Sequence, residues 1–158
     1  MYQIWNERIV ARMHILCALF SWYRIGEDTF PEKAVYPLDQ KTKALARQLQ
    51  AWIRGDLLVL RKERPAEVIF YGKKFTALSA EASTAAKKLF DVADSFLIPG
   101  ESNLFSNWCI ADTELALMLN RLLIHGDIVP EHLAAYAAGQ WQRPSVQLWV
   151  NKQRPGLE

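Results

Sequence analysis

The sequence is poor in cysteine. Its 158 residues include only two, Cys17 and Cys109, which lie far apart with no C-x-x-C spacing. This excludes a disulfide-rich scaffold and a zinc site built on paired cysteines. A reducing cytoplasm with two free thiols is the simpler interpretation, and one disulfide is the alternative.

A large excess of positive or negative charge is also lacking. Nineteen Lys and Arg residues against 17 Asp and Glu residues give a formal net charge of +2. A nucleic-acid-binding domain needs a larger positive excess, or basic residues clustered on one face. The basic pairs at 61–62, 73–74 and 87–88 show no pattern of interleaved aromatic residues, so we interpret them as solvated surface and expect no nucleic-acid partner.

No hydrophobic run is long enough for a transmembrane helix. The segment Met13–Tyr23 is apolar, but it has about half of the ~20 residues needed to cross a bilayer. Arg8 and Arg12 precede it as in a signal peptide, yet no small-x-small cleavage site follows. We therefore expect a soluble cytoplasmic protein, with a membrane-associated helix over residues 9–25 as the weaker alternative.

Short catalytic motifs are missing as well. The chain has no phosphate-binding loop, no G-x-S-x-G and no H-E-x-x-H sequence. Its three histidines, His14, His125 and His132, are scattered, and His125 is expected to interact with a helix dipole rather than to catalyse. The residues alone therefore predict no catalytic residue and no metal ligand.

What the chain does have is apolar residues in long helical patterns. From Ile110 to Ile124 they cover most of the circumference of a helix, so this helix should be buried on nearly all sides. Asp112 stands where its carboxylate can accept backbone N–H groups at the helix start, and Gly126 can end the helix in a left-handed conformation. Such a helix must have others packed around it.

Capping residues and prolines predict the surrounding helices. Asp39 should start a long helix that ends before Pro65, Ser79 a second helix through Ile98, and Pro130 and Pro144 two more. Residues 66–78 are expected to be a loop. The buried stripe of the long helix is predicted to be Leu45, Leu49, Trp52, Ile53, Leu57 and Leu60. With no alternating pattern of period two, the fold class is all-α: five or six helices around a buried central helix.

At this point the residues resemble a known family, the glutathione S-transferases. The similarity is to their helical C-terminal domain, especially that of a bacterial subgroup, and it covers residues 27–158. Residues 1–26 are unmatched and are predicted to form one amphipathic helix. The strings shared with the subgroup stand at Tyr36–Asp39, Gln50–Trp52, Glu63–Pro65, Trp108–Asp112 and Gln140–Arg143.

The resemblance implies a reaction and three substrate-binding residues. Members of the family bring the thiolate of glutathione, their co-substrate, to an apolar electrophile, and some contact glutathione across a homodimer interface. The first long helix of the domain lines the cleft, so Trp52 is expected to stack on the electrophile, Asp56 to meet a cationic amine, and Arg54 to lie beside them. The alternative is that Trp52 is core and Asp56 a solvated or ion-paired residue.

The resemblance also shows a departure at the N-terminus. Family members begin with a thioredoxin-like domain that binds glutathione through a cis-proline and a Glu-Ser or Asp-Ser pair. Residues 1–26 contain neither. We therefore expect an N-terminally truncated form, or one with its first residues out of frame, that has little activity alone. The alternative is a non-enzymatic helical module for dimerisation or ligand binding.

Cys109 admits two interpretations. A thiol at a helix N-terminus can have a lowered pKa and act as a nucleophile. However, no basic residue is adjacent and Asp112 disfavours a thiolate, so we interpret Cys109 as a structural cap. Most family members have Ser or Thr there, and a thiol is a weaker hydrogen-bond acceptor than a hydroxyl. Cys109 and Asp112 are thus predicted to serve helix capping.

Overall fold

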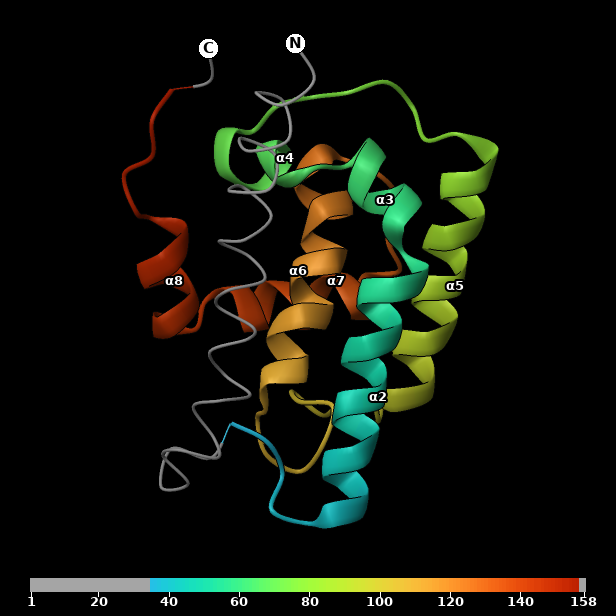
Figure 1. Ribbon diagram of the computed structural model, residues 1–158, viewed down its shortest axis with the longest axis vertical. Coiled ribbons are helices and arrows are strands. Elements are labelled where there is room, and N and C mark those ends of the chain that lie inside the picture. Colours follow the sequence, from blue (N-terminus) through green and yellow to red (C-terminus); the bar gives the residue numbers. More distant parts are fainter. Residues whose placement is uncertain (1–34, 157–158) are drawn as a thin grey trace, which may run out of the picture. The chain divides into compact units, whose positions relative to one another are not determined.

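The structure, a computed structural model, describes residues 35–156. From Tyr36 onward the chain forms one compact unit (Figure 1). Seven α-helices and no strand are found in these residues, which confirms the all-α class. The helix predicted within residues 1–26 and the alternative membrane helix over 9–25 lie outside the described residues. The helices are α2 (Gln40–Asp56), α3 (Leu58–Glu63), α4 (Ala66–Tyr71), α5 (Ala80–Phe96), α6 (Ile110–His125), α7 (Glu131–Trp141) and α8 (Pro144–Val150).

The central helix is α6, as the sequence predicts. It packs against α7, α2 and α4, and Figure 1 shows it between α2 and α8 with α7 crossing it. Side chains on all of its faces are buried, including the polar Asp112, Glu114, Asn120 and Arg121. Burial of its leucines Leu115, Leu119 and Leu122 contributes to the hydrophobic stabilisation of the unit, at about 25 cal/mol per Å² of apolar surface.

Backbone groups at both ends of α6 have partners. The Asp112 carboxylate accepts the N–H groups of Cys109 at 2.8 Å and Leu104 at 2.7 Å, while the Cys109 thiol faces the N–H of Asp112 in a capping box. Gly126 ends the helix with a φ of 98° and donates to the carbonyls of Leu122 and Leu123. The last turn therefore closes as a left-handed glycine cap.

The long helix expected between Asp39 and Pro65 is two helices, so that prediction is wrong. Asp39 caps α2 by accepting the N–H of Thr42 at 2.8 Å, as predicted. At Leu57, with φ −100° and ψ 27°, the helical path is interrupted, and this side chain is fully buried. Arg61 donates to the backbone carbonyls of Ile53 at 2.9 Å and of Arg54. Side-chain donors thus satisfy carbonyls at the break, which offsets much of its cost.

The buried stripe also differs from the prediction at two positions, because Trp52 is only half-buried and Leu45 is exposed. Leu49, Ile53, Leu57 and Leu60 are buried, but Leu45 is 37% exposed and Ala46 is fully buried instead. At the start of α2, the buried position is therefore one residue later in the sequence than predicted.

Residues 66–78 are not entirely a loop, because α4 occupies Ala66–Tyr71. Pro65 precedes it, and Gly72 ends it with a φ of 62°. Val68 and Ile69 are buried against the bundle. An isolated helix of this length is not stable in water, so its packing on α6 accounts for its formation.

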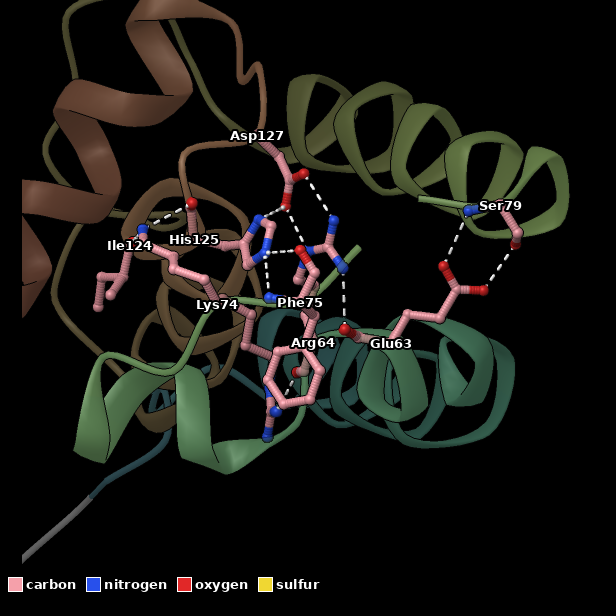
Figure 2. Close-up of polar contacts among 9 residues, drawn as sticks. Glu63, Arg64, Lys74, Phe75, Ser79, Ile124, His125 and Asp127 are labelled. Carbon is pink, nitrogen blue, oxygen red and sulfur yellow. Dashed lines mark hydrogen bonds and ion pairs between the residues drawn. The ribbon is translucent and has the colours of Figure 1, made fainter. Parts of the chain in front are cut away.

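The segment that joins α4 to α5 is tied to the end of α6 (Figure 2). His125 accepts the N–H of Phe75 at Nε2, at 2.9 Å, and its Nδ1 lies 3.2 Å from Asp127. Lys74 donates to the carbonyls of Ile124 and His125, at 2.6 and 2.7 Å. At the far end of this segment, Glu63 accepts both the N–H and the hydroxyl of Ser79, the residue that caps α5.

Candidate functional site

The three predicted substrate-binding residues lie on two different faces of α2. Successive residues of an α-helix are rotated by about 100°, so residues two apart point in nearly opposite directions. Trp52 and Asp56, four apart, share the face toward α5, where Lys88 lies. Arg54 points to α6 instead, where it pairs with Glu114. The structure brings together Trp52 and Asp56 but not Arg54.

The face toward α5 carries an aromatic ring and an exposed ion pair. Lys88 Nζ lies 2.7 Å from Asp56 Oδ2 and 5.6 Å from the centre of the Trp52 ring. The hydrogen bond from Lys88 lowers the pKa of Asp56, and Trp52 contributes to the same shift. Trp52 itself is half-buried. This cluster therefore offers an apolar surface next to two opposite charges.

On the other face, a chain of hydrogen bonds runs from the start of the unit to α6. Tyr36 donates to Gln50 Oε1 at 2.6 Å, and Gln50 Nε2 donates to Glu114 Oε1 at 2.6 Å. Arg54 reaches the same carboxylate, with Nη2 at 2.5 Å from Oε1 and Nε at 3.3 Å from Oε2. Glu114 is thus held by two side chains of α2 that are one helical turn apart.

Burial dominates the electrostatics of Glu114. The side chain is only 4% exposed, against 42% for its partner Arg54. Burial raises the pKa of the Glu114 carboxyl, while Arg54 and Gln50 lower it by a smaller amount, so the net shift is upward. The carboxylate fixes the Arg54 guanidinium at the edge of the bundle, because a buried charge keeps its partner close.

Sequence reasoning missed Glu114, Gln50 and Lys88 as parts of these clusters. Glu114 had a detectable signal, since it is an acidic residue inside an otherwise apolar helical run. A buried carboxylate needs a cationic or hydrogen-bonding partner, and Gln50 and Arg54 are spaced to supply one from the same helix face. Lys88 had no such signal, because it is one of many solvent-facing basic residues.

Cys109 is not placed for nucleophilic chemistry. Its side chain is fully buried and the thiol is free. Burial, together with the charge of Asp112, raises the pKa of the Cys109 thiol to about 12. The thiolate is therefore scarce at neutral pH, and the residue lies at the capped start of α6.

Residues 35–156 contain neither a candidate metal-binding cluster nor a helix that could span a membrane. No group of three or more His, Cys, Asp and Glu side chains is arranged to hold a metal ion there. Within the same residues, each helix falls short of the length and apolar character required to cross a membrane.

Comparisons with known proteins agree with this architecture. Residues 39–153 match the family model described as glutathione S-transferase, C-terminal domain. A crystal structure of a glutathione transferase homologue from Burkholderia BGR1, with bound glutathione, is 41% identical in sequence and has a TM-score of 0.64. The match covers 82% of this chain and 63% of that one. A comparison with curated proteins gives no match. The chain therefore belongs to the glutathione S-transferase family, which it matches through the helical C-terminal domain.

Proposed function

We propose that this chain supplies the electrophile-binding side of a glutathione-dependent reaction, the conjugation or reduction of an apolar electrophile. The observation that carries the proposal is the Trp52, Asp56 and Lys88 cluster, where an indole ring lies beside an exposed ion pair. Membership of the family and the glutathione bound to the Burkholderia homologue support it. Glutathione is then a co-substrate, and the chain acts in the cytoplasm.

Each predicted residue has a separate role in this proposal. Trp52 provides a flat apolar surface for the electrophile, because aromatic rings bind apolar groups with large contact area. Asp56 binds the ammonium group of glutathione, which takes the place of Lys88. The ion pair between Lys88 and Asp56 is exposed, so breaking it and solvating Lys88 with water costs little free energy. Arg54, positioned by Glu114, lies on a different face and holds the helix in register rather than contacting the electrophile.

Thiol activation is assigned to groups outside the helical domain. The one cysteine among residues 35–156 is buried with a raised pKa, and the charged side chains of the two clusters on α2 are engaged in ion pairs. We expect the 158-residue chain to conjugate a generic aryl chloride with glutathione close to the uncatalysed rate. A rate well above the uncatalysed reaction would contradict this part of the proposal.

Calorimetric titration with a glutathione conjugate of an aryl group tests the binding role. Trp52→Ala should weaken binding by about tenfold, the loss expected when one aromatic contact of 1 to 2 kcal/mol is removed. Trp149→Ala is the matched control, because this equally half-buried tryptophan packs edge-on against Phe70 at 4.7 Å, far from α2 in sequence. Equal affinities for the two variants would overturn the assignment of Trp52.

The alternative is a helical module for dimerisation or ligand binding. Exposed leucines near and within the first helices favour it, since Leu38 is 89% and Leu58 is 49% exposed. A partner could cover either side chain separately, because Leu38 and Leu58 flank opposite ends of α2. Retention on immobilised glutathione would support the transferase-like function, whereas self-association of the chain without glutathione binding would support a homodimeric module.

A further inference from the structure

Helix α8 lies at the edge of the unit (Figure 1) and buries only one of its seven side chains, that of Val146. Leu148, by contrast, is 76% exposed. A helix of this length is not stable by itself in water. Contacts made by the rest of the chain must therefore hold α8 in place.

Two aromatic rings join α8 to α4. Trp149 of α8 packs edge-on against Phe70 of α4, with ring centroids 4.7 Å apart and an interplanar angle of 82°. Both side chains are half-buried. An edge-to-face pair leaves ring faces open, and the face of an aromatic ring attracts cations because it carries a negative electrostatic potential. The pair can therefore hold α8 and bind a cation at the same time.

The cation is Arg154, in the segment that follows α8. Its guanidinium carbon lies 4.0 Å from the centre of the Phe70 ring and 5.5 Å from that of the Trp149 ring. The residues on either side of Arg154 are exposed, whereas Arg154 itself is half-buried. Beside it, the hydroxyl of Tyr71 in α4 donates to the carbonyl of Pro155 at 2.9 Å. The segment after α8 therefore turns back toward α4 and places one cationic side chain on the rings.

The same guanidinium binds backbone carbonyl groups at the end of α8. Its Nη1 donates to Val150 at 2.6 Å and to Lys152 at 2.8 Å, and its Nη2 donates to Trp149 at 2.6 Å. Carbonyl groups at a helix C-terminus have no partner within the helix and carry partial negative charge. The planar fork of an arginine can engage several such acceptors while its face stacks on a ring, which the point charge of a lysine does not reproduce. Rings and carbonyl groups together therefore match a guanidinium.

We propose that the Phe70–Trp149 pair and the carbonyl groups at the end of α8 are a guanidinium-binding site that the chain fills with its own Arg154, and that this occupancy closes residues 144–156 onto α4 as a strap. When Arg154 leaves the site, the strap loses three hydrogen bonds and two cation–π contacts at once. Residues 144–156 then open as a local unit while α6 stays folded. The site shares no residue with the cluster on α2, so the strap does not depend on the proposed transferase role.

Hydrogen–deuterium exchange of the full chain, read by mass spectrometry of its peptides, tests the strap. The N–H groups of Gln147, Asn151 and Lys152 are hydrogen-bonded within residues 143–152, so they exchange when the strap opens. Arg154→Ala should speed their exchange about tenfold or more, while the amides of α6 keep the rates of the unmodified chain. Lys152→Gln, which removes an exposed cation from the same segment, is the matched control and should change neither. Unchanged exchange in Arg154→Ala, or acceleration that extends through α6, would overturn the proposal.

Chemical rescue and a second variant separate a guanidinium site from a general loss of packing. Ethylguanidinium added to Arg154→Ala should slow exchange in residues 147–152 again, whereas ethylammonium at the same concentration should have a much smaller effect, since it lacks the planar fork. The unmodified chain, whose site is filled, should not respond to either cation. Phe70→Leu removes the ring nearest to Arg154 but keeps an apolar side chain, and it should speed exchange in the same residues about threefold or more. Failure of ethylguanidinium to rescue, equal rescue by the two cations, or unchanged exchange in Phe70→Leu would each contradict the assignment of the site.

Discussion

Arg54 and Glu114 form an ion pair whose two members differ tenfold in exposure. The Arg54 side chain is 42% exposed and the Glu114 side chain 4%, with Nη2 and Oε1 2.5 Å apart. The pair therefore joins a charge that water can solvate to one that only protein groups can stabilise. Gln50 supplies the other hydrogen bond to this carboxylate. Removing one partner is thus not equivalent to removing the other.

This asymmetry predicts different costs for the two neutral substitutions. Arg54→Gln leaves the Glu114 charge buried with only Gln50 beside it, and we expect a loss of about 3 kcal/mol in the free energy of unfolding at pH 7.5. Glu114→Gln leaves only a partly exposed guanidinium, and we expect a loss of about 1 kcal/mol or less. Urea denaturation of both variants measures the difference. Equal losses would contradict the structural account of the pair.

The pH dependence follows from the raised pKa of Glu114. Burial raises the pKa of this carboxyl in the folded state above its unfolded value of about 4.3. The folded state thus binds more protons in this range, so the contribution of Glu114 to stability is fully present below pH 4.3 and is lost as pH rises through the folded pKa. Because Arg54→Gln raises that pKa further, its destabilisation should be smaller at pH 5 than at pH 7.5. A loss of stability in Arg54→Gln that is the same at pH 5 and pH 7.5 would argue against a raised pKa of Glu114.

Asp127 should show the opposite pH dependence. Burial alone would raise the pKa of its carboxyl, but hydrogen bonds and charge from Arg64, with His125, lower it on balance. Its contribution to stability is therefore present above about pH 3.9 and is lost as pH falls through the folded pKa. We expect Asp127→Asn to cost about 3 kcal/mol at neutral pH, because Arg64 is 1% exposed and would be left as a buried, incompletely paired charge.

The control for Asp127→Asn is Asp56→Asn, which breaks an ion pair of the same type at the surface. Lys88 and Asp56 are 55% and 46% exposed, so this substitution should change stability by less than about 1 kcal/mol. Unfolding of the two variants by guanidinium chloride at pH 7 measures the difference in their stability. If Asp127→Asn were as mild as its control, the contacts drawn in Figure 2 would not be stabilising the end of α6.

The parts of the fold that the sequence predicted are those with local signals. Asp39 and Ser79 start α2 and α5, and Gly126 ends α6, because caps act on backbone groups only a few residues away. The burial of α6 was predictable since its apolar residues surround the helix. These features depend on short-range geometry, which a single sequence contains.

The predictions that failed concern features that depend on tertiary contacts. Helix α4 is too short to form alone, so only its packing on α6 determines it. The interruption at Leu57 depends on Arg61 reaching back to the carbonyls of Ile53 and Arg54. In the same way, the separation of Arg54 from Trp52 and Asp56 follows from helix geometry, but the partner on each face was visible only in three dimensions.

Gly55, inside a helix, and Gly126, which caps one, should respond in opposite ways to substitution by alanine. Gly55 lies in α2 and an added Cβ would meet nothing within 4 Å, so Gly55→Ala should stabilise the chain by up to about 1 kcal/mol. Gly126 has a φ of 98°, which L-residues rarely adopt, so Gly126→Ala should destabilise it by about 1 kcal/mol or more. Thermal unfolding of both variants checks the signs. A loss of stability in Gly55→Ala would indicate that this position needs a close approach of another group.

The buried thiol of Cys109 should be protected from alkylation in the folded chain. With its pKa raised to about 12, the thiol is almost entirely protonated at pH 8, and the side chain has no exposed surface. Treatment with iodoacetamide at pH 8, followed by peptide mass spectrometry, should find Cys109 modified only when denaturant is present. Cys109→Ser should retain the fold and strengthen the cap by about 0.5 kcal/mol, because a hydroxyl accepts the backbone N–H of Asp112 better than a thiol does. Rapid alkylation in the native state would instead favour the nucleophile interpretation, since it requires an accessible thiolate at the start of α6.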